Sequence, residues 1–303
     1  MIPTCFTTLT GRPRRLAWFL LALLVFACQV ELQAQTTQAR KQLDSKPKIA
    51  YVEVVGGSFS SLLAPDGKQA LATVGNFAIR VVPVSTADFA RFTTQHPKWR
   101  KSEVVSGVLA DGQYLRNWSK DLDPDPATLA QPVTNISWFA AAAYCATEGG
   151  RLPTWHEWEY VAAADANRKD ARSDPVWRSK ILDWYGQASK TLPVAGQTPA
   201  NLFGVRDLHG VIWEWVDDFG ALMVSGDNRT QGDPDTLQFC GAGALSANDR
   251  ENYPVLMRMA MLSSLSAAST NRNLGFRCVR PAIQHVGTAA SIRANQLLKK
   301  GKP

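Results

Sequence analysis

Four short motifs follow one another in a fixed order along the second half of this chain, and they constrain its fold more than any other feature. They are Pro132–Cys145 (PVTNISWFAAAAYC), Gly149–Tyr160 (GGRLPTWHEWEY), Asn201–Trp215 (NLFGVRDLHGVIWEW) and Asn273–Cys278 (NLGFRC). Long irregular stretches rich in proline, glycine, asparagine and aspartate separate them. Pattern alone therefore predicts an α+β chain that is rich in loops.

Two of these motifs carry signals for the start and end of helices. Ser137 is placed to cap a helix over Trp138–Glu148, and Gly149 ends it because glycine adopts a left-handed turn at little cost. Thr154 and Glu157 have the spacing of a capping box, which predicts a second helix over Trp155–Ala164. The other expected elements are a helix opening at Ser85 and two strands, Ile49–Val55 and Val74–Val82.

Taken together, the four motifs resemble the formylglycine-generating enzyme (sulfatase-modifying factor) family, over roughly residues 49–281. The resemblance implies a single domain with the C-type-lectin-like α+β fold of that family. It also implies a disulfide between Cys145 and Cys278, because the family joins the cysteines at the matching positions. The alternative is that these two residues are buried thiols.

The resemblance also exposes a gap in the expected chemistry. The family oxidises a substrate cysteine with Cu(I) held between two thiolates, and the matching positions here are Asp249 and Pro254 or their immediate neighbours within Asn248–Pro254. No cysteine lies between Cys240 and Cys278. Since Cu(I) prefers soft sulfur ligands, we expect neither a copper cofactor nor standard formylglycine generation. Whether the chain is an enzyme at all stays open.

Two sets of residues are nevertheless candidates for a site. The catalytic candidates are Cys240, Asp249 and Tyr253. The edge of a pocket is suggested by Tyr114, Arg116 and Trp118 in a polar loop, together with Arg250 in the segment that matches the family's copper-binding region. The alternatives are that Cys240 packs as a small hydrophobic residue and that the pocket residues form a surface salt-bridge patch.

Calcium is the other metal that the resemblance implies. Glu214 keeps the acidic position of the family's calcium site, but Val211 replaces an asparagine that supplies an oxygen ligand there. Calcium takes about six to eight oxygen ligands, so Glu214 is only a weak calcium candidate. The alternative is that backbone N–H groups or an arginine hold this carboxylate. His156 and His209 show no metal-binding spacing, and we expect both to be structural.

The N-terminus has the pattern of an export signal. Three arginines precede an apolar run, Leu16–Ala27, which as a helix would be about 18 Å long and too short to cross a bilayer. We expect a signal peptide over residues 1–34, a linker over 35–48, the domain over 49–281 and a basic tail over 282–303. Alternatively, the signal ends at residue 27 and Cys28 is lipidated, which would be the one contact with a membrane.

Charge and resemblance together suggest three functions. The formal net charge is +7, but no basic groove with interleaved aromatic residues occurs, so nucleic acid is not an expected partner. Asn201–Trp215 and Phe239–Ala244 look closest to the exported NirV-like branch, which implies a periplasmic accessory or maturation factor for a cuproenzyme such as copper nitrite reductase. The alternatives are a non-standard oxidase or modifying enzyme acting on a small molecule or peptide, and a lectin-like module that only binds a ligand.

Overall fold

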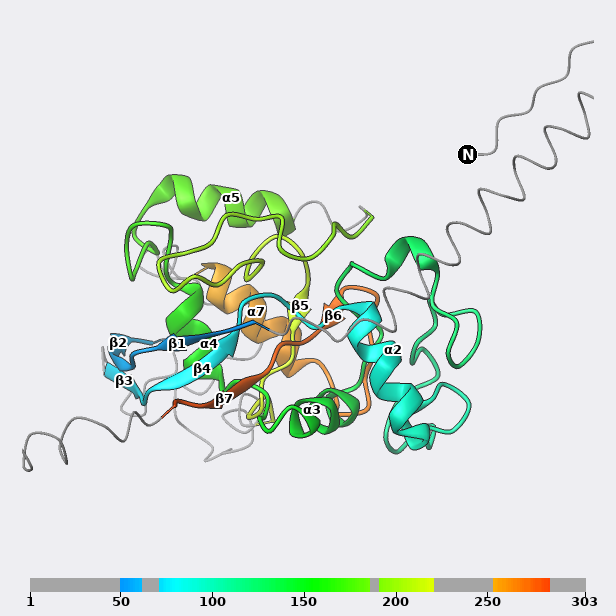
Figure 1. Ribbon diagram of the computed structural model, residues 1–303. Coiled ribbons are helices and arrows are strands. Elements are labelled where there is room, and N and C mark those ends of the chain that lie inside the picture. The colour runs from blue at the N-terminus through cyan, green and yellow to red at the C-terminus, as the bar shows by residue number, and fades with distance from the viewer. Residues whose placement is uncertain (1–49, 62–70, 186–190, 221–252, 284–303) are drawn as a thin grey trace, which may run out of the picture. The chain divides into compact units, whose positions relative to one another are not determined.

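The computed structural model describes residues 50–61, 71–185, 191–220 and 253–283 (Figure 1). The expected signal peptide with Cys28, the linker and nearly all of the basic tail lie outside these ranges, as do Cys240, Asp249 and Arg250. Within the described ranges, no helix has both the length and the apolar character needed to cross a membrane.

Three small sheets organise the described part of the domain. The first is antiparallel, with β4 (Phe77–Arg80) between β1 (Tyr51–Val54) and β7 (Val279–Pro281). The second pairs β2 (Gly57–Ser60) with β3 (Leu71–Val74), also antiparallel, and the third pairs β5 (Trp213–Glu214) with β6 (Leu274–Gly275) in parallel. The first sheet thus joins the beginning of the domain to its last motif, as the neighbouring blue, cyan and red strands of Figure 1 show.

Helices surround these sheets. Among the described residues, the α-helices are α2 (Thr86–Gln95), α3 (Trp138–Thr147), α4 (Trp155–Ala162), α5 (Pro175–Tyr185) and α7 (Tyr253–Ser263), with two short 3₁₀ turns, η1 (Pro97–Trp99) and η2 (Pro126–Thr128). Together with the small sheets they form the mixed α+β, loop-rich domain that the motifs predicted.

The expected helix caps are present. The Ser137 hydroxyl accepts a hydrogen bond from the backbone N–H of Ala140 at 3.3 Å. Thr154 and Glu157 form the full capping box, in which each side chain accepts a backbone N–H of the other residue at 3.2 and 2.9 Å. Gly149 follows α3 with a φ of 73°, the left-handed conformation expected there. Local spacing therefore predicted the start of these helices correctly.

One expected strand and two helices differ from the sequence-based prediction. The strand predicted over Val74–Val82 is two strands, β3 and β4, interrupted at Gly75 and Asn76. The Asn76 side chain accepts a hydrogen bond from the backbone N–H of Gly56 at 2.9 Å, which ties the interruption to the end of β1. Helices α5 and α7 were not predicted.

The core between α2 and α3 is aromatic. Phe89, which has no exposed surface, contacts Phe92, Tyr144, Trp118 and Phe276 with ring centroids 5.2 to 6.3 Å apart. These residues come from α2, α3, the loop after η1 and the last motif. Their packing gathers segments that are far apart in the sequence around one helix.

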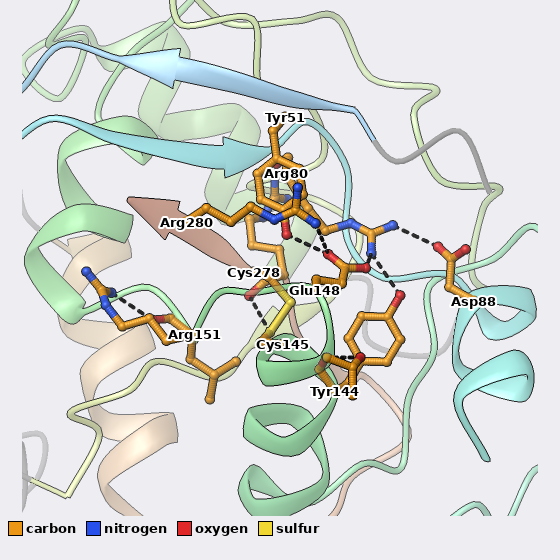
Figure 2. Close-up of a disulfide and its surroundings, with 12 residues drawn as sticks. Tyr51, Arg80, Asp88, Tyr144, Cys145, Glu148, Arg151, Cys278 and Arg280 are labelled. Atoms are coloured by element: carbon orange, nitrogen blue, oxygen red, sulfur yellow. Dashed lines mark hydrogen bonds and ion pairs between the residues drawn. A yellow bond between two sulfur atoms is a disulfide. The ribbon is translucent and has the colours of Figure 1, made fainter. Parts of the chain in front are cut away.

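A disulfide joins α3 to the last motif. It links Cys145 to Cys278 across 133 residues, with the Cα atoms 5.4 Å apart (Figure 2). Both residues are fully buried. For a loop of this length, chain entropy predicts a stabilisation of about 4–5 kcal/mol relative to the reduced chain.

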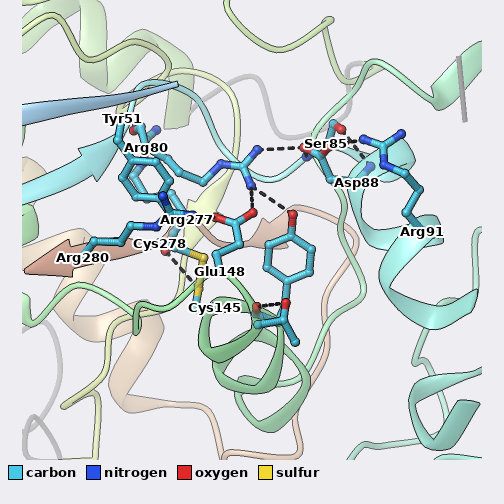
Figure 3. A network of polar contacts seen from close by, with 12 residues as sticks. Tyr51, Arg80, Ser85, Asp88, Arg91, Cys145, Glu148, Arg277, Cys278 and Arg280 are labelled. Atoms are coloured by element: carbon cyan, nitrogen blue, oxygen red, sulfur yellow. Dashed lines mark hydrogen bonds and ion pairs between the residues drawn. A yellow bond between two sulfur atoms is a disulfide. The ribbon is translucent and has the colours of Figure 1, made fainter. Parts of the chain in front are cut away.

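A network of charged groups lies next to the disulfide (Figure 3). The Arg80 guanidinium donates to Asp88 at 2.7 Å, to Glu148 at 2.6 Å and to the Tyr144 hydroxyl at 3.0 Å. The Tyr51 hydroxyl donates to the other oxygen of Glu148 at 2.5 Å. Burial alone would raise the pKa of Asp88, but Arg80 outweighs burial and holds it below its ordinary value. The network ties the first sheet to α2 and α3.

Candidate functional site

A buried ion pair occupies the centre of the Trp-Glu-Trp motif. Glu214 on β5 accepts hydrogen bonds at 2.7 Å from Nε and Nη2 of Arg277, one on each carboxylate oxygen. The Trp158 indole N–H of α4 donates to Oε2 of the same carboxylate at 2.8 Å. Neither Glu214 nor Arg277 has exposed side-chain surface. Arg277 also donates to three backbone carbonyl oxygens, those of Arg80, Val81 and Arg206.

This arrangement bears on the weak calcium candidate. Both oxygens of Glu214 are used by Arg277 and Trp158, which is the arginine-held alternative that the sequence left open. Val211, which stands in place of the family's asparagine, is buried. Across the described ranges, no three His, Cys, Asp or Glu side chains are grouped to hold a metal ion. The carboxylate therefore serves as the partner of a buried guanidinium.

Aromatic rings and a second arginine surround this pair. Arg258 of α7 donates to the main-chain carbonyl of Glu214 at 2.5 Å, and its guanidinium lies 3.6 Å from the ring centroid of Trp158. His209 meets Trp158 edge to face at 5.6 Å and Trp177 of α5 at 5.4 Å. Helices α4, α5 and α7 thus meet at one cluster of indole, imidazole and guanidinium groups.

The protonation state of His209 follows from its surroundings. Its Nε2 lies 2.8 Å from the carbonyl oxygen of Ala162, which can only accept a hydrogen bond, so Nε2 carries the proton. Burial lowers the pKa of His209 to about 4, and the charges of Arg258 and Arg277 act in the same direction. The ring is therefore neutral at pH 7, and Nδ1 has a lone pair available as an acceptor.

Two cavities flank His209 and Trp177. The smaller, about 20 Å³, lies between α4 and the start of α7 and has Pro254 in its wall. The larger is a groove of about 260 Å³ between α5 and the loop over residues 198–210. We call this larger space the α5 groove. His209 and Trp177 form part of the wall of both.

Two of the sequence-predicted pocket residues that the structure describes lie in the core. Tyr114 and Trp118 are buried in the core, 3% and 2% exposed, where Trp118 packs on Phe89 and the Tyr114 hydroxyl donates to the carbonyl oxygen of Trp99 at 3.0 Å. Burial raises the pKa of Tyr114. Apolar burial of these rings outweighed the polarity of the surrounding loop, so both rings belong to the core.

Two further candidates, Arg116 and Tyr253, lie within the described residues. Arg116 is exposed and bonds the side chain of Gln113. Tyr253 is the first residue of α7. The sequence-based prediction missed the α5 groove because it did not predict helix α5. Within that helix, Lys180 and Ile181 follow Trp177 by three and four residues, the spacing that places side chains on one face.

Comparisons with known proteins agree with the motif pattern. A family model described as a sulfatase-modifying factor enzyme 1-like domain matches residues 35–282. The inactive C-alpha-formylglycine-generating enzyme 2 of Mus musculus is 28% identical over 289 residues, covering 80% of this chain and 89% of the relative. The formylglycine-generating enzyme of Streptomyces coelicolor is 33% identical over 178 residues, covering 52% and 55%. The structure of PvdO from Pseudomonas aeruginosa is 20% identical with a TM-score of 0.39, covering 76% of this chain and 94% of that one.

Proposed function

Because this chain belongs to the sulfatase-modifying factor family, we propose that it is an exported member without copper-dependent oxidase chemistry, and that it acts as an accessory or maturation factor for another protein. The single observation behind this proposal is its inventory of sulfur ligands. The family's reaction depends on two thiolates that hold Cu(I), and this chain lacks that pair.

The thiol inventory is short. The chain has five cysteines, of which Cys145 and Cys278 are joined in a disulfide. Cys5 and Cys28 precede the domain, which leaves Cys240 as the one thiol within it. A proline cannot bind a metal, and a carboxylate is a hard ligand that suits Cu(I) poorly. The residues at the two copper positions therefore do not fit the ion, and no copper-dependent step is assigned to this chain.

Relatives named as inactive occur among the proteins that this chain resembles. Two relatives that match about 80% of this chain, from Mus musculus and Bos taurus, are named as inactive members, and each is about as similar to it as the active enzymes are. Family membership alone therefore does not separate active from inactive chains. The cysteine positions make that distinction because the metal chemistry depends on them directly.

We further propose that the client is an exported copper enzyme of the nitrite reductase type. The support is the likeness of Asn201–Trp215 and Phe239–Ala244 to the NirV-like branch, together with the N-terminal signal pattern. An accessory role requires no copper site in this chain, since the client would hold the metal.

The client proposal is tested by deleting the gene and measuring copper content and activity of the reductase in the exported fraction. We expect both to fall and to return when the wild-type gene is restored. Unchanged copper loading and activity in the deletion strain would end the proposal. Cell fractionation tests the lipid anchor: a lipid-anchored protein should leave the membrane fraction when Cys28→Ser removes the lipidated residue, whereas a free exported protein should be found outside the membrane fraction with or without this change.

Loss of oxidase activity is tested separately on the purified mature protein. Supplied with Cu(I), oxygen, a reductant and a sulfatase-type cysteine peptide, it should form no aldehyde and bind substoichiometric copper. Cys240→Ser should change neither result. Aldehyde formation by the wild type would overturn the proposal, and substrate-dependent oxygen consumption that Cys240→Ser abolishes would point instead to a modified enzyme.

A further inference from the structure

We propose that the α5 groove binds a small aromatic carboxylate that also carries a hydroxyl group. This inference goes beyond the accessory role and does not depend on it. The groove lies between α5, near the top of Figure 1, and the loop over residues 198–210. Its volume of about 260 Å³ is close to the lower end of the range for small-molecule sites, about 300 Å³.

Most polar groups in the wall of the groove are already used to build that wall. The Asp207 carboxylate accepts hydrogen bonds from the backbone N–H groups of Gly196 and Thr198 and from the Thr198 hydroxyl. Asn201 donates to the carbonyl oxygen of Val161 and accepts from two backbone N–H groups of its own loop. These two side chains therefore hold the loop in shape, and neither is available to a ligand.

Three groups in the wall are available. The neutral imidazole of His209 has an acceptor at Nδ1, because Nε2 donates to Ala162. Trp177 is partly buried, and its indole N–H donates no hydrogen bond to any of the described residues. Lys180, one turn further along α5, is exposed and has no ion-pair partner within the part of the chain that the structure describes.

Charge favours an anionic ligand. Asp165, the other acidic residue in the wall, is paired with Arg168. Asp207 directs its oxygens to the turn at Gly196 and Thr198. Lys180 is the one lysine or arginine among the residues that line the groove, and an ammonium at the mouth of a partly apolar groove attracts a carboxylate.

The rest of the wall favours an aromatic body over a sugar. Besides Trp177, several apolar residues line the groove, namely Ala164, Ile181, Pro199, Val205 and Leu208. A sugar ring has many hydroxyl groups, and each would need a polar partner once it left water. A flat aromatic ring can pack against the indole, and one hydroxyl on it would donate to Nδ1 of His209.

Isothermal titration of the mature protein with 4-hydroxybenzoate tests this inference. We expect saturable binding that weakens about tenfold for benzoate, which has no hydroxyl, and at least tenfold for 4-hydroxybenzamide, which has no charge. Lys180→Met should reproduce the loss seen with the amide, whereas Lys180→Arg should retain binding. The control is Lys169→Met, an exposed lysine that forms no part of the groove wall.

Since Lys180 is exposed, its substitution should leave the fold intact, which circular dichroism checks. Absence of saturable binding by 4-hydroxybenzoate up to millimolar concentration would overturn the inference. Equal binding of the acid and the amide, or of wild type and Lys180→Met, would overturn it as well. None of these measurements involves a client protein, so failure here leaves the accessory role standing, and the reverse also holds.

Discussion

Arg277 and Glu214, 63 residues apart in the sequence, form a bidentate ion pair in which neither side chain has exposed surface. The pair joins the Trp-Glu-Trp motif to the last motif and sits beside the indole of Trp158. Taking two charges out of water is unfavourable, and the close hydrogen bonds between them offset that loss. Removing one of the two side chains would therefore leave the other as a buried charge without its partner, which costs more stability than removing both.

Glu214→Leu should destabilise the domain by about 3–5 kcal/mol, because it leaves the Arg277 guanidinium buried without its counter-charge. The double variant Glu214→Leu/Arg277→Met should lose less than Glu214→Leu alone, since both charges are then gone. Denaturant unfolding of the variants provides the measurement. Equal or greater loss in the double variant would show that hydrogen bonds from Arg277 to backbone carbonyls, rather than its charge pairing, dominate.

Reduction of the disulfide should lower the free energy of unfolding. Cys145→Ala/Cys278→Ala opens a loop of 133 residues, for which we expect a loss of about 4 kcal/mol. Unfolding curves with and without reductant give the value. Cys240→Ser is the matched control, because it removes a cysteine outside the disulfide and should leave the response to reductant unchanged.

The domain should become less stable in acid through His209. Its native pKa is about 4 and its ordinary value is 6.5, so between these pH values the unfolded chain binds a proton that the folded chain does not. Stability contributed by the neutral ring is therefore present above about pH 6.5 and is lost as the pH falls towards 4. The shift corresponds to about 3 kcal/mol.

His209→Gln isolates this contribution. Glutamine can still donate to the carbonyl oxygen of Ala162 but does not titrate. The difference in unfolding free energy between wild type and this variant should shrink by about 3 kcal/mol from pH 7.5 to pH 4. The comparison is needed because burial raises the pKa of Glu159, whose contribution changes in the opposite direction over acidic pH. A difference independent of pH would contradict a neutral buried ring.

Gly150 should not tolerate alanine. A Cβ at this position would lie 2.1 Å from the carbonyl oxygen of Val279, so the backbone of β7 would have to move. We expect a loss of about 3 kcal/mol, at the upper end for overpacking. Gly112→Ala is the matched control, since nothing lies within 4 Å of its Cβ and stability should change by less than about 0.5 kcal/mol. Thermal unfolding of the two variants provides the measurement, and equal melting temperatures would contradict this prediction.

The sequence by itself determined the features that depend on local spacing or on the presence of a residue type. A hydroxyl before a helix can satisfy only the backbone N–H groups of the first turn, so Ser137 and Thr154 predicted their helices correctly. The ordered motifs indicated the family and fold. The lack of cysteine between Cys240 and Cys278 is read directly from the chain, and no folding could restore it.

Only the tertiary structure decided which polar groups meet and which aromatic residues are buried. The sequence left two partners open for Glu214, and Arg277 became the partner because β5 and β6 pair in parallel. Trp118, expected at a pocket edge, is instead packed against Phe89. Contacts of this kind join residues many positions apart. Their free energies come from desolvation and packing, which depend on every neighbouring segment and not on the spacing within one.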